Sequence, residues 1–313
     1  MHILSTMAML MLTLAIGYGL NKMQILDEQT NRQLSRLIVD VTTPLLVIAS
    51  VASAQGDDTT KVMGLLYFGM GLYATMPIIA YGLVRLLKVE KYHRAVYAGA
   101  LIFSNNVFMA FPIIKALYGD TALFYTSVLH MPFNLVFYTL QMQWMRRLAE
   151  KDGLISPVKS DTLRHRLHLI FNNGIFAVVI AFFLFITGTT LPHVLQQTAA
   201  FIGNTTMPLA MLIVGSSMAS YSLSAIAQEP KIVLFTFVRL VVFPLVAYIF
   251  FSSFVQDPMV LGIITVTLGM PAANILAMAA APYDNQNKIA TLMVGFSTIA
   301  AMVTIPLMLL VMG

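Results

Sequence analysis

The chain contains 313 residues, of which 58% are hydrophobic and only 10% are charged. A soluble domain usually has about 25% charged residues, so this composition excludes a water-facing surface and predicts a protein embedded in a membrane. The absence of cysteine excludes disulfides, cysteine-ligated zinc and thiol catalysis. The net charge of +5 does not indicate nucleic-acid binding, because the basic residues lie in short loops.

Ten hydrophobic segments are long enough to cross a bilayer, which takes roughly 20 helical residues. The first has no basic residues before it and is followed by many similar segments, so we expect a membrane helix rather than a cleaved signal peptide. The expected helices cover residues 2–20, 34–54, 62–86, 95–118, 121–144, 171–190, 198–220, 230–254, 258–282 and 288–311. The predicted fold class is therefore an all-α integral membrane protein.

One long hydrophilic segment, residues 145–170, divides the chain at its centre. It separates five expected helices in residues 1–144 from five in residues 171–313. Fifteen of the 18 lysines and arginines lie in the loops that follow the odd-numbered helices, the central loop included. Because cytoplasmic loops are enriched in basic residues, we expect both termini outside the cell and the central loop in the cytoplasm.

Five helices in each half imply that an internal repeat would be inverted, and three sequence pairs suggest such a repeat. The pairs are Asp40–Pro44 with Asn204–Pro208, Pro77 with Pro244, and Tyr118 with Tyr283, and their members are separated by 164, 167 and 165 residues. The first pair contains the polar positions Thr43, Asn204 and Thr206, which are candidates for the site. Inverted repeats are typical of secondary transporters, whose substrate site lies between the repeats near the middle of the membrane.

The fourth expected helix contains Asn105 and Asn106, followed by Pro112. Adjacent asparagines are costly in hydrocarbon, and proline removes a backbone donor, so we expect the helix to be interrupted at Pro112. The ninth has a counterpart, in which Gly269 can end one half-helix and Pro271 can begin the next, before Asn274.

Interrupted helices in corresponding halves predict a transport site, and the free N–H groups at half-helix N-termini favour an anion. We expect the substrate to contact Asn105, Asn106, Pro112, Pro271 and Asn274. The alternative is that these are ordinary proline kinks, with the asparagines bonded to neighbouring helices.

These segments, with the Thr-Thr-Pro and Thr-Thr-Met-Pro turns, resemble the auxin efflux carrier family, part of the bile acid/auxin carrier superfamily. Bacterial members include proteins described as malate and malonate permeases. The resemblance covers essentially the whole chain and implies that helices four and nine are broken and cross at the midplane, beside a scaffold, with a carboxylate at the crossing. Asn105, Pro112 and Pro271 match the family's asparagine and prolines, whereas Ser104, Val107 and Ala110 stand where many relatives have glycine.

Three ionisable residues lie inside expected helices and are candidates for coupling or charge pairing. Asp40 could carry a proton or neutralise sodium, or it could pair with a nearby basic side chain. Arg239 could bind a substrate carboxylate, pair with Asp40, or form a structural salt bridge. His130 is either a proton relay or a satisfied structural group.

The sequence thus predicts a secondary transporter of a small organic carboxylate, malate/malonate-like or auxin-like, in the plasma membrane. We expect neither a cofactor nor a metal site; the coupling ion could be H⁺ or Na⁺. Expected partners are the anion and membrane lipids, with no nucleic acid; the protein could also pair with a second copy in a homodimer. Alternatives are a sodium-coupled bile-acid-type carrier and a channel or receptor with the same pocket. An enzyme is not expected, because paired carboxylates, metal-spaced histidines and a nucleophile elbow are missing.

Overall fold

The computed structural model describes residues 2–57, 59–151, 172–219 and 229–312. Every regular element in these ranges is a helix. The elements of the first half are α1 (His2–Lys22), α2 (Glu28–Leu37), η1 (Ile38–Thr42), α3 (Thr43–Ser50), η2 (Val51–Ala54), α4 (Thr59–Leu86), η3 (Lys91–His93), α5 (Arg94–Ile102), η4 (Asn106–Ala110), α6 (Phe111–Leu129), α7 (Met131–Val136), η5 (Phe137–Gln141) and α8 (Met142–Lys151).

The regular elements described in the second half are also helices. Its described elements are α10 (Asn173–Thr187), α11 (His193–Gly203), α12 (Thr206–Met218), α14 (Pro230–Phe237), η6 (Val238–Val242), α15 (Phe243–Phe251), α16 (Pro258–Leu268), α17 (Asn274–Ala280) and α18 (Asp284–Met312). Helix α8 continues the fifth expected span beyond residue 144, and most of the expected central loop lies outside the described residues.

Six continuous helical segments in the described ranges are long and apolar enough to cross a membrane: Glu28–Ala54, Thr59–Leu86, Asn106–Lys151, His193–Met218, Pro230–Phe251 and Gln286–Leu310. Two shorter apolar helices are Asn173–Thr187 and Pro258–Leu268. The third segment is bent sharply at Gly119, where φ is 83°. Glycine adopts a positive φ at little steric cost. The chain is thus a multi-helix membrane protein, while ten crossings and inverted halves stay predictions.

Wide π-helical turns precede three prolines and keep their helices continuous. In η1, η4 and η6 the backbone bond that closes the turn spans five residues, as from Phe111 N–H to the Asn106 carbonyl. Pro44, Pro112 and Pro244 are each the second residue after one of these turns. Because a proline ring clashes with the carbonyl four residues earlier, a locally wider turn makes room for it.

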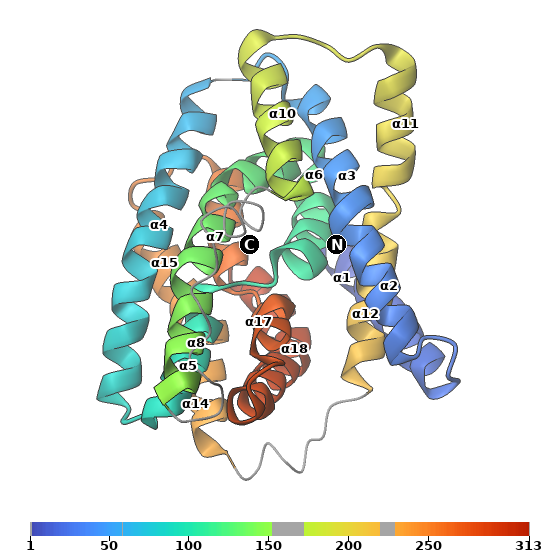
Figure 1. Cartoon of the computed structure of the whole chain (residues 1–313). Helices are drawn as coiled ribbons and strands as arrows, with labels where there is room; N and C mark the ends of the chain where they lie inside the picture. Colours follow the sequence, from blue (N-terminus) through green and yellow to red (C-terminus); the bar gives the residue numbers. More distant parts are fainter. Residues whose placement is uncertain (1, 58, 152–171, 220–228, 313) are drawn as a thin grey trace.

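The helices form two groups, each with elements from both halves of the chain (Figure 1). We call α1–α3 with α10–α12 the panel, in which α1 packs along α12 and α3 packs against α10 and α11. We call α4–α8 with α14–α18 the bundle, in which α4 packs against α5 and α6, and α17 packs against α18. Helix α6 also contacts the panel through α3 and α12, so it lies at the boundary.

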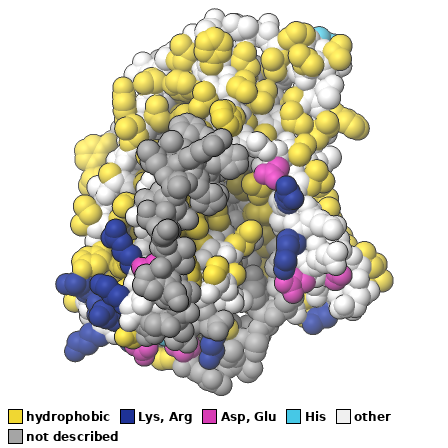
Figure 2. All heavy atoms as spheres, in the orientation of Figure 1, with side chains coloured by type: hydrophobic (Ala, Val, Ile, Leu, Met, Phe, Trp, Pro, Cys, Tyr) yellow, Lys and Arg dark blue, Asp and Glu magenta, His cyan; other side chains and the backbone are white. Residues whose placement is uncertain are grey.

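Glycine allows the closest helix contact in the panel. A Cβ atom at Gly215 of α12 would collide with the backbone of Leu14 in α1. Backbones that approach this closely gain dispersion contacts, which replace the hydrophobic effect as the main attraction between helices in lipid. On the face shown in Figure 2, hydrophobic side chains cover the upper part, and most Lys and Arg side chains lie toward the lower end.

Candidate functional site

Two helix breaks meet inside the bundle. Helix α5 ends at Ile102 and α16 ends at Leu268, and the chain after each helix is non-helical. The two non-helical segments run antiparallel and are joined by an isolated β-bridge between Ser104 and Ala272. The Asn105 N–H donates to the Pro271 carbonyl at 2.9 Å, and the Ala273 N–H donates to the Phe103 carbonyl at 3.0 Å. Backbone groups freed by one break are therefore satisfied by the other.

The position of the first break corrects the expectation from the sequence. The helix is interrupted before Asn106, and Pro112 lies in the first turn of α6, behind the π-helical turn η4. In the second break Gly269 caps α16, as expected. Pro271, which was expected to begin the next helix, lies in the non-helical segment, and that helix begins at Asn274. The wide turn accommodates Pro112, so this proline does not need to break the helix.

Side chains from other helices hold the crossing together. Ser104 Oγ donates to the Thr267 carbonyl at 2.9 Å, and Ser297 Oγ of α18 accepts from the Ala272 N–H at 3.1 Å. Arg239 of η6 is 2% exposed and donates to the Met270 carbonyl at 2.9 Å, to the Leu101 carbonyl and to Ser104 Oγ. One buried guanidinium thus binds both breaks.

A cavity of about 190 Å³ lies beside the crossing, between the bundle and the panel. Its lining is mostly apolar, with aromatic residues Phe108, Phe111, Phe133 and Tyr138 from the bundle. The panel contributes side chains of η1, α3 and α10. None of the described residues that line it is a Lys, Arg, Asp or Glu.

Four polar side chains of the lining have a buried atom without a hydrogen-bond partner among the described residues. These atoms are Thr43 Oγ1, Asn105 Nδ2, Asn106 Oδ1 and His130 Nε2. Because buried polar atoms are almost always hydrogen-bonded in proteins, such a cluster indicates a place where a ligand or water completes the bonding. The other ring nitrogen of His130 bonds the Thr126 carbonyl at 2.7 Å, which fixes the orientation of the ring.

The structure brings five of the predicted residues to the cavity: Thr43, Asn105, Asn106, His130 and Asn274. Pro112 and Pro271 lie in the chain next to it but not in its lining. Sequence reasoning missed the aromatic residues of the lining and the whole contribution of α10. Phe133 follows His130 by three residues, a spacing that places both on one helix face.

The remaining predicted residues lie elsewhere. Asp40 is part of an exposed pair, in which Arg36 Nε lies 3.3 Å from its Oδ2, so its partner is this neighbour and not Arg239. Asn204 accepts from Lys115 Nζ at 2.7 Å. Thr206 Oγ1 donates to Thr42 Oγ1 at 2.8 Å, which joins the two positions related by 164 residues.

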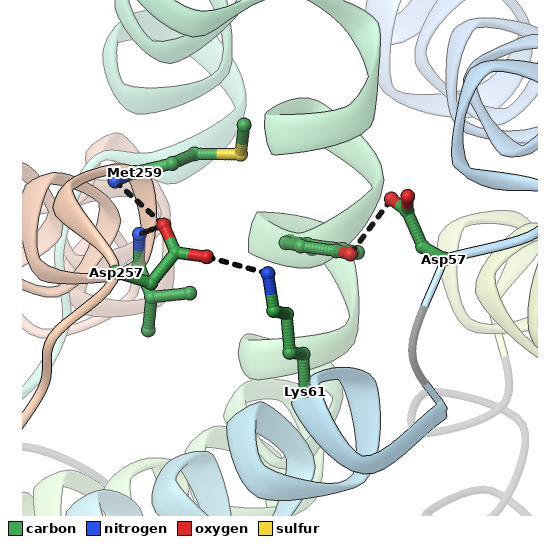
Figure 3. Close-up of polar contacts among 6 residues, drawn as sticks. Asp57, Lys61, Asp257 and Met259 are labelled. Atoms are coloured by element: carbon green, nitrogen blue, oxygen red, sulfur yellow. Dashed lines mark hydrogen bonds and ion pairs between the residues drawn. The ribbon is translucent and has the colours of Figure 1, made fainter.

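A second polar cluster lies where α4 and α16 begin, beside α6 (Figure 3). Lys61 Nζ of α4 is 2.8 Å from Asp257 Oδ2, and Asp257 Oδ1 accepts from the N–H groups of Met259 and Val260 at the start of α16. The hydrogen bond from Lys61 is the main cause that lowers the pKa of the Asp257 carboxyl from its ordinary value. Nearby, the Tyr125 hydroxyl donates to Asp57 Oδ2 at 2.8 Å.

Comparison with known proteins identifies the family. No curated protein matches the chain. The family described as membrane transport protein matches residues 2–309, which is nearly the whole chain. The chain therefore belongs to the membrane transport protein family, which is the family of the auxin efflux carriers.

Proposed function

We propose that the protein is a secondary carrier of a small organic carboxylate, which binds in the cavity beside the crossed breaks and crosses the membrane by alternating access. The observation that carries this proposal is the cluster of unpartnered buried atoms on Thr43, Asn105, Asn106 and His130. An apolar cavity with a few convergent polar groups is the usual form of a small-molecule site.

The polarity of the helix at the cavity supports an anion as the substrate. The helical segment made by η4 and α6 begins at Asn106, directly beside the cavity. Its first N–H groups and its dipole favour negative charge. The side chain of Asn105, the residue before it, makes no capping hydrogen bond, and its Nδ2 is free to donate. A carboxylate there would accept from the amide and lie at the positive end of the segment.

The rest of the lining supports one charge rather than two. Four Phe and Tyr side chains line the cavity in the described residues, and no Lys or Arg side chain does. A dicarboxylate would bury its second charge without a partner, which is costly in apolar surroundings. We therefore favour a monocarboxylate with an apolar body, auxin-like in chemistry, over a dianion like malate or malonate.

The contacts between bundle and panel support alternating access. Among the described residues, three polar bonds join α6 to the panel or to the chain that continues from α3: Lys115 with Asn204 at 2.7 Å, Thr121 Oγ1 with the Ser53 carbonyl at 2.9 Å, and Tyr125 with Asp57 at 2.8 Å. Two of them bind η2 and the segment that follows it. With ten crossings, inverted halves and both termini outside, this end faces the cell exterior. The structure then represents a state closed on that side, and these bonds break when the bundle moves.

Uptake into proteoliposomes tests the function. We expect saturable uptake of a labelled monocarboxylate, with counterflow when the unlabelled anion is loaded inside. Unsaturated conductance without counterflow would instead indicate a channel, and uptake that requires sodium would indicate a bile-acid-type carrier. Asn287→Ala is the matched control for cavity variants, because Asn287 does not line the cavity and its side chain accepts from Thr291 within α18.

A further inference from the structure

Arg239 is a buried charge that has no acidic partner among the described residues. Its side chain lies in η6, is 2% exposed, and does not take part in any of the described ion pairs. A guanidinium stays protonated in proteins, so the positive charge is permanent. A charge of this kind is costly to bury unless other groups compensate it.

The compensation comes from the C-terminal ends of two half-helices. Leu101, whose carbonyl accepts from Arg239, lies in the last turn of α5, and Met270, whose carbonyl also accepts, follows the end of α16. The end of a helix carries roughly half a negative charge on its free carbonyls. Two such ends together offer about one negative charge. The guanidinium therefore lies where the breaks would otherwise attract a monovalent cation.

We propose that Arg239 is a built-in counter-cation, which makes a bound metal cation at the crossing unnecessary for anion binding. This inference rests on the proposed function, because it concerns how the same crossing supports an anion. Ser104 lines the cavity and accepts from Arg239, so the charge lies one side chain away from the ligand. Arg239 does not line the cavity, and its role is that of a positioning residue.

The geometry also explains why arginine fits this position. Its planar fork donates to three acceptors on two different breaks, which a lysine with a single ammonium head does not reproduce. Because the guanidinium is covalently attached, it cannot leave with the substrate. A sodium gradient therefore cannot be coupled through this place in the crossing, and energy must come from the anion gradient, the membrane potential or protons.

Thermal unfolding of the purified protein tests the inference in the absence of a carboxylate substrate. We expect the wild-type Tm to be the same in sodium chloride and in choline chloride at equal ionic strength. Arg239→Ala should lower Tm, and methylguanidinium should raise it again in a saturable manner, because it fills the vacated place. Arg32→Ala is the control, since Arg32 forms an exposed pair with Glu28 and should not respond.

Two results would overturn the proposal: saturable stabilisation of the wild type by sodium, or a response of Arg239→Ala to methylguanidinium no larger than that of Arg32→Ala. If Arg239→Ala does not fold, Arg239→Gln and Arg239→Lys decide. We expect Arg239→Gln to weaken binding of phenylacetate about tenfold or more relative to neutral phenylacetamide, and Arg239→Lys to lose less. Equal losses for the acid and the amide would show a purely structural role. Rescue by methylguanidinium without phenylacetate binding would refute only the proposed substrate.

Discussion

Replacing Asn105 with alanine separates the contribution of the cavity from that of the fold. The backbone N–H of Asn105, which bonds the Pro271 carbonyl across the crossing, is kept in the variant. The side chain gives up no bond within the described protein, because its Nδ2 has no partner. The loss therefore falls on the ligand. A hydrogen bond to a charged group contributes about 1.5–3 kcal/mol, so we expect Kd for the carboxylate to rise roughly 10- to 150-fold.

Equilibrium binding to purified protein, with Tm measured on the same samples, checks this expectation. Asn105→Ala should keep a Tm close to that of the wild type, and the control Asn287→Ala, outside the cavity lining, should keep the wild-type Kd. Asn274→Ala, at the other break, should also weaken binding, since Asn274 lines the cavity. If Asn105→Ala is folded and binds the carboxylate with wild-type affinity, the crossing is not the binding site.

Three further variants address stability and coupling. Thr206→Val removes the buried bond to Thr42, so Tm should fall by about 2 °C with Kd unchanged, as measured by thermal unfolding and binding; a change in Kd alone would contradict this. The lowered pKa of Asp257 means that its pairing with Lys61 stabilises the fold above the ordinary carboxyl range and is lost as pH falls through the folded-state pKa. Acid unfolding of Asp257→Asn should accordingly depend less on pH below about 4 than that of the wild type; identical pH profiles would disprove the assignment. Asp40→Asn should leave anion binding unchanged, because the cavity lining does not include Asp40; a loss of the pH dependence of uptake in this variant would identify Asp40 as the proton-coupling group.

The sequence allowed the helical class and several residues of the cavity lining to be predicted, because both depend on side-chain chemistry. Long apolar runs indicate membrane helices, and adjacent asparagines in such a run are too costly to occur without a reason. Asn105, Asn106 and Asn274 consequently lie in the cavity lining. The prediction was wrong about where the fourth helix breaks, because a π-helical turn in front of Pro112 is a backbone adjustment without a side-chain signature.

The hydrogen-bond partners of Arg239 also could not be predicted from the sequence. From the sequence, a charge inside a membrane helix suggests an anionic partner, and the candidates were a substrate carboxylate, Asp40 or another acidic residue in a structural salt bridge. The structure compensates Arg239 with the Leu101 and Met270 carbonyls, which every residue type possesses and which become free only because two helices end there. A residue pattern therefore indicates that a buried charge needs compensation, but its acceptors follow only from the crossing of the two breaks. For the same reason, replacing either partner side chain would leave the carbonyls in place, and only a change at Arg239 itself can test the charge.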